Sequence, residues 1–510
     1  MRALVFAVAS VAVAQTLPGT RPLSLSGDPA ARMVDGIHAY LDRATALSRA
    51  SRHPSRARLA EILGEVDPRV DFSAPELVAT TATAALLARA KTYSVYRVRW
   101  PVFEGVHAEG LLFQPNRTPA ARVVAIPDAD ETPEESAIAP RLAAQGCQVL
   151  SLAILDRRDT YSGNPRFRMT NQPHREYLYR MAFPAGRHII GYEVEKILAA
   201  VDWFGKQPDR VPVAVWGYGE GGLLALDAAA LDSRIDVAVV SGYFGPREAM
   251  WQEPIFRNVW SFQRDFGDAE VAALIAPRKL IVETQAGPRW DGPSHADPKR
   301  TGAAPGRLEP VAREAVVREA DRARELGANV DVASDALDAF CTAIHRQIRV
   351  SHEAAPKLPV PEGRARRQFD ELADYTQRIL RASEAVRNAY WSNRRTTQAG
   401  RDRVWNDMIG RLPPPDLPMN PRSRHAYSNL HWDGYEVTLD VFPDVFAYGV
   451  LLLPKDLKPG ERRPVVVCQH GLEGRASDVA GPRADERYYR RFAVRLAEQG
   501  FITYAPQNPY

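Results

Sequence analysis

The sequence predicts an α/β fold in which a mostly parallel sheet is flanked by helices, present in two tandem copies. Short aliphatic runs such as Val123-Val124-Ala125-Ile126 alternate with amphipathic helical patterns, as expected when helices cover both faces of a parallel sheet. The pattern of residues 98–115 recurs at residues 437–454. A chain of 510 residues is long enough for two such domains.

The recurring pattern has the same order of elements in both copies. Each copy opens with an amphipathic hairpin that ends at a proline. An apolar strand follows at 122–126 and at 464–468, and then a helix that ends in Gln-Gly at 145–146 and at 499–500. A further apolar strand comes next in each copy, so the order is typical of βαβ units.

Composition excludes several classes of protein. Charged residues make up 25% and hydrophobic residues 45% of the chain, as in water-soluble globular domains. A formal net charge of +4 gives no dense basic surface, so we expect no nucleic-acid partner. We also expect no membrane span, because no apolar run is long enough to cross a bilayer. The sequence does not define the oligomeric state. The three cysteines, Cys147, Cys341 and Cys468, form neither a disulfide framework nor a metal-ligand pattern, and we expect no metal.

The N-terminus has the features of a short secretory signal. Arg2 precedes an apolar stretch, and Ala12-Val13-Ala14 forms a small-residue cleavage site before Gln15. We therefore expect a secreted or periplasmic protein. The alternative is an ordinary helix that packs on a core.

A strand, a glycine-rich turn and a helix follow one another near the middle of the chain. The strand at 211–216 continues into Gly-Tyr-Gly-Glu-Gly-Gly and then into a helical pattern. In a G-x-S-x-G nucleophile elbow, small residues two places on either side of the serine let strand and helix approach each other. Gly217 and Gly221 occupy those flanking places, and Gly219 occupies the place of the nucleophile. The turn is retained, but glycine has no side chain that could attack a carbonyl.

The same turn also satisfies G-x-G-x-x-G through Gly217, Gly219 and Gly222, so dinucleotide binding is an alternative. Such a site needs an acidic residue at the end of the next strand. That strand ends in Ser241-Gly242 instead, and we therefore expect no cofactor.

The acid and the base of a catalytic triad are harder to find. Glu283 ends a later apolar strand and Asp291 follows it, so either could be a relic of the triad acid, or a solvated or capping carboxylate. The base should follow the last strand, but no histidine occurs between His295 and His345. His345 lies in a helix-like stretch and is expected on the surface.

Together with the repeat, the elbow and Gln469-His470-Gly471 resemble the dienelactone hydrolase and acetyl xylan esterase branch of the α/β-hydrolases, over residues 90–350 and 430–510. The resemblance implies that His470, Gly471 and Leu472 form the loop whose main-chain amides help to build the oxyanion hole. For His470, a structural role in a turn is the alternative. Asp128 occupies the corresponding place in the first copy, where its charge would oppose an oxyanion.

The resemblance implies an exported serine-type esterase that acts on a small-molecule or carbohydrate ester. We expect the first copy to be catalytically dead and the second to carry the chemistry. The second copy ends at Tyr510 before any elbow, so we expect this chemistry in the full-length protein. The alternative is a non-catalytic protein that binds a carbohydrate or a partner. The expected boundaries are a signal peptide at 1–14, a helical N-terminal region at 28–90, a degenerate hydrolase domain at 91–350, a linker at 351–366, a helical and proline-rich connector at 367–425, and the N-terminal part of a second hydrolase domain at 426–510.

Overall fold

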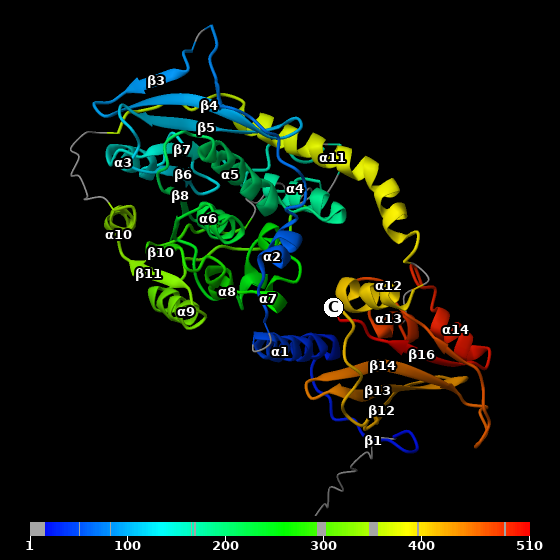
Figure 1. The fold of residues 1–510 in the computed structure, drawn as a ribbon. Coiled ribbons are helices and arrows are strands. Elements are labelled where there is room, and N and C mark those ends of the chain that lie inside the picture. Colours follow the sequence, from blue (N-terminus) through cyan, green and yellow to red (C-terminus); the bar gives the residue numbers. More distant parts are fainter. Residues whose placement is uncertain are drawn as a thin grey trace, which may run out of the picture. The chain divides into compact units, whose positions relative to one another are not determined.

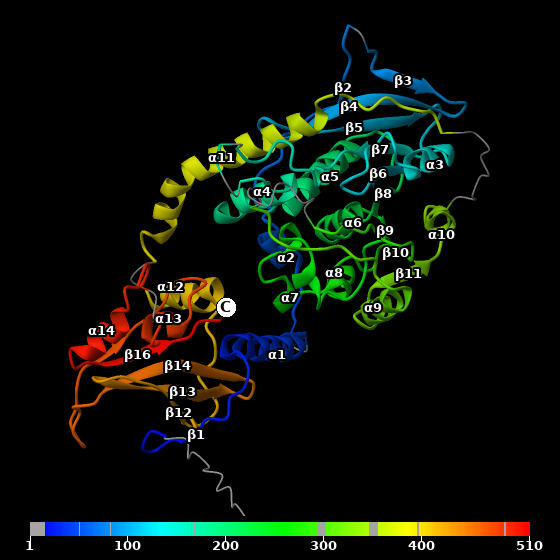
Figure 2. The ribbon, with the colours of Figure 1, turned by 180° about the vertical axis from the view of Figure 1, so that it is seen from behind.

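The chain forms two compact units. A computed structural model describes residues 16–49, 52–81, 83–164, 166–167, 170–292, 302–345, 355–394, 397–483 and 486–509 (Figures 1 and 2). The larger unit is Ser48–Thr397, and the smaller unit joins Gln398–Tyr510 to Met1–Leu47. The predicted signal peptide lies outside the described residues. Within those ranges, no helix has both the length and the apolar character needed to cross a bilayer.

The larger unit is built on one ten-stranded sheet. Its path is β11-β10-β9-β8-β6-β7-β5-β4-β2, and β3 pairs with β4. Each pair of neighbouring strands from β11 to β7 along this path is parallel. Strand β5 runs antiparallel to β7, and β4 runs antiparallel to β5. The predicted mostly parallel α/β sheet is thus confirmed. The strands are β2 (Glu76–Leu77), β3 (Leu86–Arg89), β4 (Tyr93–Phe103), β5 (Val106–Pro115), β6 (Arg122–Ile126), β7 (Gln148–Leu152), β8 (Val213–Tyr218), β9 (Val237–Ser241), β10 (Lys279–Glu283) and β11 (Asn329–Ala333).

Helices cover both faces of this sheet (Figure 1). One face packs on α3 (Ile138–Ala144) and α10 (Ala336–Ala343). The opposite face packs on a larger group of helices. The residues of strand β6 face the two helical layers alternately: Val123 and Ala125 face the first layer, and Val124 and Ile126 face the second. Because both faces of the strand are covered, its sequence is apolar without interruption. The larger group consists of α2 (Arg56–Leu63), α4 (His174–Ala182), α5 (Ile189–Gly205), α6 (Glu220–Leu231), α8 (Asp268–Ala273), α9 (Arg313–Glu325) and α11 (Arg364–Trp391).

The N-terminal region at 28–90 differs in part from the helical region that we predicted. It contains α1 (Pro29–Arg49) and α2, but also the short strands β2 and β3. Both strands pair with β4 at the edge of the sheet, and this pairing with distant backbone overrides the local helical pattern. Most of α1 belongs to the smaller unit, so the region does not form one continuous domain.

The smaller unit contains a six-stranded sheet in the order β1-β12-β13-β14-β16-β15. Its strands begin before the predicted boundary at residue 426, and β1 is contributed by the N-terminal part of the chain. Helices α13 (Ala476–Ala480) and α14 (Phe492–Glu498) pack on this sheet around a separate core, in which Cys468 is fully buried. The strands are β1 (Arg21–Pro22), β12 (Arg422–Ser428), β13 (Trp432–Phe442), β14 (Val445–Pro454), β15 (Val465–Val467) and β16 (Ile502–Pro506).

The two sheets share a strand order and a hairpin register. In the larger unit the path runs β4-β5-β7-β6, and in the smaller unit β13-β14-β16-β15. Tyr93 pairs with Pro115 in the first hairpin, and Trp432 pairs with Pro454 in the second, 339 positions further along the chain (93 to 432, 115 to 454). Each hairpin also has one register shift close to its turn. These positions are those of the sequence repeat.

Candidate functional site

The turn between β8 and α6 has the geometry of a nucleophile elbow. Gly219 has φ 58° and ψ −117°, a backbone conformation that L side chains rarely adopt. A Cβ atom on Gly217 would lie 1.8 Å from the carbonyl oxygen of Gly221, and one on Gly221 would lie 2.1 Å from that of Ile126. Strand and helix therefore approach so closely that only glycine fits at either flanking place.

The Asp128 carboxylate occupies the space in which the side chain of a nucleophile would lie. A Cβ atom on Gly219 would be 2.4 Å from Asp128 Oδ1 and 2.9 Å from Pro288 Cγ. The same Oδ1 accepts a hydrogen bond of 2.8 Å from the Glu220 main-chain N–H. In a serine hydrolase of this fold, the N–H of the residue after the nucleophile donates to the oxyanion. One internal carboxylate thus takes the place of both nucleophile and oxyanion.

Arg157 holds this carboxylate in a bidentate ion pair. Its two terminal nitrogens lie 2.6 Å and 2.8 Å from the oxygens of Asp128, and the two side chains are 2% and 7% exposed. Burial opposes ionisation of Asp128, but the hydrogen bonds and charge of Arg157 outweigh it and lower the pKa of Asp128 below its ordinary value. Asp128 is therefore a buried anion.

A second carboxylate, Glu220, extends this pair into a buried ion network. Glu220 accepts hydrogen bonds from Arg257 (2.9 Å), Arg175 (3.1 Å) and Arg157 (3.2 Å). Its full burial would raise its pKa, but the three guanidinium groups lower the pKa far below the usual range. Arg175 also pairs with Glu193 at 2.7 Å. A buried network of paired carboxylates and guanidinium groups therefore lies at this elbow, where a serine hydrolase has its nucleophile and oxyanion hole.

Sequence reasoning identified Asp128 and the elbow but missed the arginines of the network. Arg157 follows β7, Arg175 lies in the first turn of α4, and Arg257 ends a short 3-10 helix. Nothing in their local sequence marks them as neighbours. The available signal was the presence of two carboxylates beside the elbow, which, if buried, require cationic partners.

The structure places Glu283 at the end of β10 as predicted, where it acts as a capping carboxylate. It accepts hydrogen bonds from the Ser241 hydroxyl (2.5 Å) and from the main-chain N–H of Ala336 at the start of α10 (2.9 Å). Asp291 lies beyond it in the loop and is exposed. Glu283 therefore joins β9 to α10, and no ring of a described histidine is among its hydrogen-bond partners.

His188 and His345 lie at the ends of helices in this unit. His345 follows α10, is exposed and has φ 57°, whereas His295 lies outside the described residues. His188 caps α5 because its Nδ1 accepts a hydrogen bond from the Ile190 N–H. Burial lowers the pKa of His188 to about 4, so this ring is neutral at physiological pH.

An aspartate–histidine pair that the sequence analysis missed joins the loop after β7 to the first residue of α4. His174 Nδ1 lies 2.6 Å from Asp156 Oδ1, and its Nε2 accepts a hydrogen bond of 2.9 Å from the Tyr161 N–H. The His174 ring is fully buried. Because both ring nitrogens are already bonded, the pair fixes the loop and has no free nitrogen that could activate a nucleophile.

In the smaller unit, the predicted oxyanion loop follows β15. The His470 ring is buried; Nδ1 lies 2.8 Å from the Gly471 carbonyl oxygen, and Nε2 accepts a hydrogen bond from the Asn508 N–H. The Gly471 N–H donates to the Tyr489 hydroxyl at 3.0 Å. Leu472 is 96% exposed. The imidazole thus shapes the loop, and His470 stands where the larger unit has Asp128.

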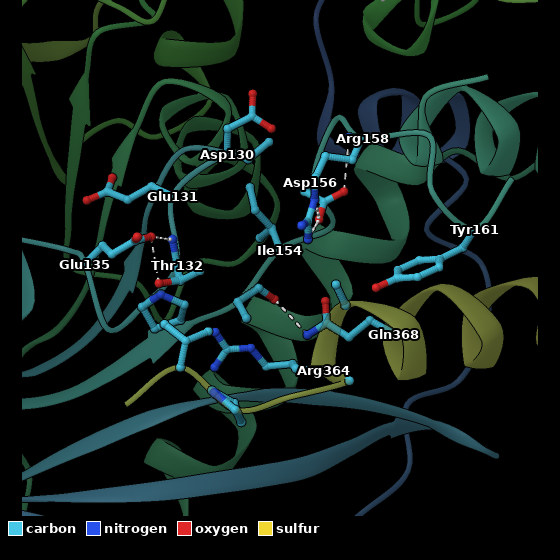
Figure 3. A pocket seen from close by; sticks show the side chains of 17 residues that line it. Asp130, Glu131, Thr132, Glu135, Ile154, Asp156, Arg158, Tyr161, Arg364 and Gln368 are labelled. Atoms are coloured by element: carbon cyan, nitrogen blue, oxygen red, sulfur yellow. Dashed lines mark hydrogen bonds and ion pairs between the residues drawn. The ribbon is translucent and has the colours of Figure 1, made fainter. Parts of the chain in front are cut away.

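A pocket of about 570 Å³ lies in the larger unit at the carboxyl ends of β6 and β7 (Figure 3). Ligands of open α/β sheets bind at this edge. The walls are the loop after β6 (129–135), the loop after β7 (153–161) and the segment that leads into α11 (360–368). Neither Gly219 nor Asp128 lines it.

No family model and no curated protein matches this sequence. Among solved structures, acetyl xylan esterase 1 from Thermoanaerobacterium sp. is 14% identical, with 44% of this chain and 75% of that chain covered and a TM-score of 0.32. The glucuronoyl esterase from Solibacter usitatus is 15% identical, with 53% and 79% covered and a TM-score of 0.35. An acetyl xylan esterase from Paenibacillus sp. is 18% identical, with 45% and 77% covered and a TM-score of 0.32. The α/β-hydrolase fold is established by the sheet and the elbow of this chain itself.

Proposed function

We propose that this protein belongs to the carboxylic-ester hydrolases, that its larger unit is non-catalytic, and that ester hydrolysis is the task of a second hydrolase copy that includes the smaller unit. The observation that carries the proposal is the Asp128 carboxylate, which fills the space beside Gly219 and accepts the Glu220 N–H. An ester carbonyl has neither a nucleophile nor a free amide donor at this elbow.

The shared strand order and hairpin register support the view that the smaller unit is a second copy of the same fold. His470 stands where the first copy has Asp128, so the loop 470–472 carries no anion that would repel an oxyanion. The described residues 422–483 and 486–509 contain no strand–turn–helix elbow with a nucleophile. The substrate that we propose is a carbohydrate ester, and the protein is proposed to be exported.

A binding function for the larger unit is the second candidate. It is favoured by the pocket at the carboxyl ends of β6 and β7, which persists beside an elbow without a nucleophile.

The non-catalytic assignment is tested by assaying the 510-residue chain for hydrolysis of p-nitrophenyl acetate and by labelling it with a fluorophosphonate. We expect no turnover above that of a heat-denatured sample and no adduct on a serine of residues 48–397. Turnover that fluorophosphonate abolishes, with the adduct mapped by peptide mass spectrometry to that range, would contradict the assignment.

The catalytic half of the proposal is tested with the longest product of the gene. We expect that product to hydrolyse p-nitrophenyl acetate and to lose this activity when a fluorophosphonate labels a serine outside residues 48–397. A product without fluorophosphonate-sensitive activity would refute the esterase assignment and leave binding as the remaining function.

A further inference from the structure

Strand β15 of the smaller unit exposes two valines on one face of its sheet. Val466 and Cys468 pack on the core that α13 and α14 cover, so Val465 and Val467, which alternate with them along the strand, point to the opposite face. Their side chains are 60% and 64% exposed. β15 is also the last strand in the order of this sheet, so an apolar surface and a strand edge are exposed together.

Val467 begins a row of side chains that crosses the sheet on this exposed face. It pairs with Tyr504 in β16, and Tyr504 pairs with Leu451 in β14. Leu451 in turn pairs with Tyr435 in β13, and these three partners are half-buried. Residues that are paired between neighbouring strands lie on the same face of a sheet, so the four side chains form one continuous surface.

The larger unit has the same row at the equivalent positions of its own sheet. Val124 pairs with Leu150 in β7, and Leu150 pairs with Leu112 in β5. Leu112 in turn pairs with Tyr96 in β4. Here Val124 and Leu150 are fully buried, because the helical layer that contains α5 and α6 packs on this face. One copy of the face is therefore covered by helices, and the other exposes its valines.

Helix α5 shows which kind of element covers such a face. Most of its residues are buried, and the Trp100 indole of β4 donates a hydrogen bond of 3.1 Å to the main-chain oxygen of Lys196 in α5. In the smaller unit, Leu439 has the place of Trp100 in the hairpin register and carries no donor. A helix on this second face is therefore held by hydrocarbon contacts, which requires an apolar helix surface.

The edge of β15 calls for a strand beside that helix. In the larger unit, β6 has parallel partners on both sides, β7 and β8, whereas β15 pairs with β16 and ends the strand order. The Cys468 N–H donates to the Tyr504 carbonyl oxygen at 2.7 Å, so the Val467 N–H, one residue earlier, points to the outer edge. Main-chain groups at such an edge are a template for pairing with a further strand.

We propose that this face and edge of the smaller unit are the docking surface for a helix followed by a parallel strand, of the α5–β8 kind, carried by the longest product of the gene. In the larger unit, α5 and β8 follow β7 in the chain, so the equivalent segment is expected to follow β16.

Docking in the register of the larger unit would bring an elbow to the predicted oxyanion loop. Ile126 of β6 pairs with Gly217, the first glycine of the elbow, and lies two residues after Val124. The residue two places after Val467 is Gln469, which precedes the loop 470–472. A strand that pairs with β15 in this register ends beside that loop. This consequence rests on the proposed function, because it assigns the nucleophile of the second copy to the docked strand.

The test compares maleimide labelling of Val467→Cys in the 510-residue chain and in the longest product of the gene. The three native cysteines are buried, so the introduced thiol is the one that reacts rapidly. We expect labelling to be at least about tenfold slower in the longest product, because a covered thiol reacts only when the structure opens locally. Leu77→Cys is the matched control, since Leu77 is 60% exposed on β2, the last strand of the other sheet, and should be labelled equally in both. Equal labelling of Val467→Cys in the two chains would overturn the proposal.

Two further measurements identify the occupant. Hydrogen exchange at the Val467 amide should be slower in the longest product, and an unchanged rate would overturn the pairing of a strand with β15. Labelling of Val467→Cys in the 510-residue chain that slows as protein concentration rises would show that a second copy covers the face, and would also overturn the proposal. Slow labelling in a longest product without fluorophosphonate-sensitive activity would support the docking and refute the esterase assignment. Thermal unfolding confirms that the variants remain folded.

Discussion

Replacing Asp128 by asparagine tests whether the buried ion network stabilises the larger unit. The substitution keeps an oxygen that can accept the Glu220 N–H but removes the charge that Arg157 binds at 2.6 Å and 2.8 Å. Removal of one partner of a buried ion pair costs about 3–5 kcal/mol. Arg157 keeps Asp130 and Glu220 as partners, at 3.0 Å and 3.2 Å, so we expect a loss of about 3 kcal/mol in the free energy of unfolding at pH 7.

The dependence on pH follows from the lowered pKa of Asp128. A carboxyl group whose pKa in the folded state lies below its unfolded value stabilises the fold above that unfolded value, here 3.8. This contribution is lost as the pH falls through the folded pKa. The difference in stability between the wild type and Asp128→Asn should therefore be largest near pH 7 and shrink below pH 3.8.

Urea denaturation gives the free energies, and hydrogen exchange of α6 attributes the transition to the larger unit. Glu76→Gln is the control, because the pair of Glu76 with Arg99 is 57% and 44% exposed and should contribute at most about 1 kcal/mol. A loss for Asp128→Asn no larger than that of the control, or a loss independent of pH, would refute the reasoning.

Two further substitutions probe the elbow and the core behind it. Gly219→Ser should lower stability by about 1–3 kcal/mol beyond the loss in Gly146→Ser, because both glycines have positive φ but only the Cβ at Gly219 meets Asp128. It should also remain inactive toward p-nitrophenyl acetate, and measurable activity would contradict the prediction that no histidine is placed to act as the base at this elbow. Asp227→Asn should raise the melting temperature more at pH 8 than near pH 4, since burial and Asp268 raise the pKa of Asp227 and the wild type loses stability as the pH rises above 3.8. An equal gain at both pH values would show that Asp227 does not titrate in this way.

The elements that the sequence predicted well are those whose cause is local. The run 122–126 is apolar because both faces of β6 are covered, and the alternation before Pro115 matches the hairpin β4–β5. Gly217 and Gly221 mark the elbow because the backbones there approach too closely for any side chain. Periodicity and steric exclusion act over a few residues, so they can be read from the chain without the fold.

The chemistry of the candidate site was decided by the tertiary structure. Asp128 meets Arg157 across 29 positions and Glu220 across 92, and Glu220 meets Arg257 across 37. Spacing along the chain does not encode such contacts, because the order of the strands brings them together. The sequence by itself determined that Gly219 has no nucleophile, whereas the fold determined that a buried carboxylate, held by Arg157, occupies that nucleophile's place.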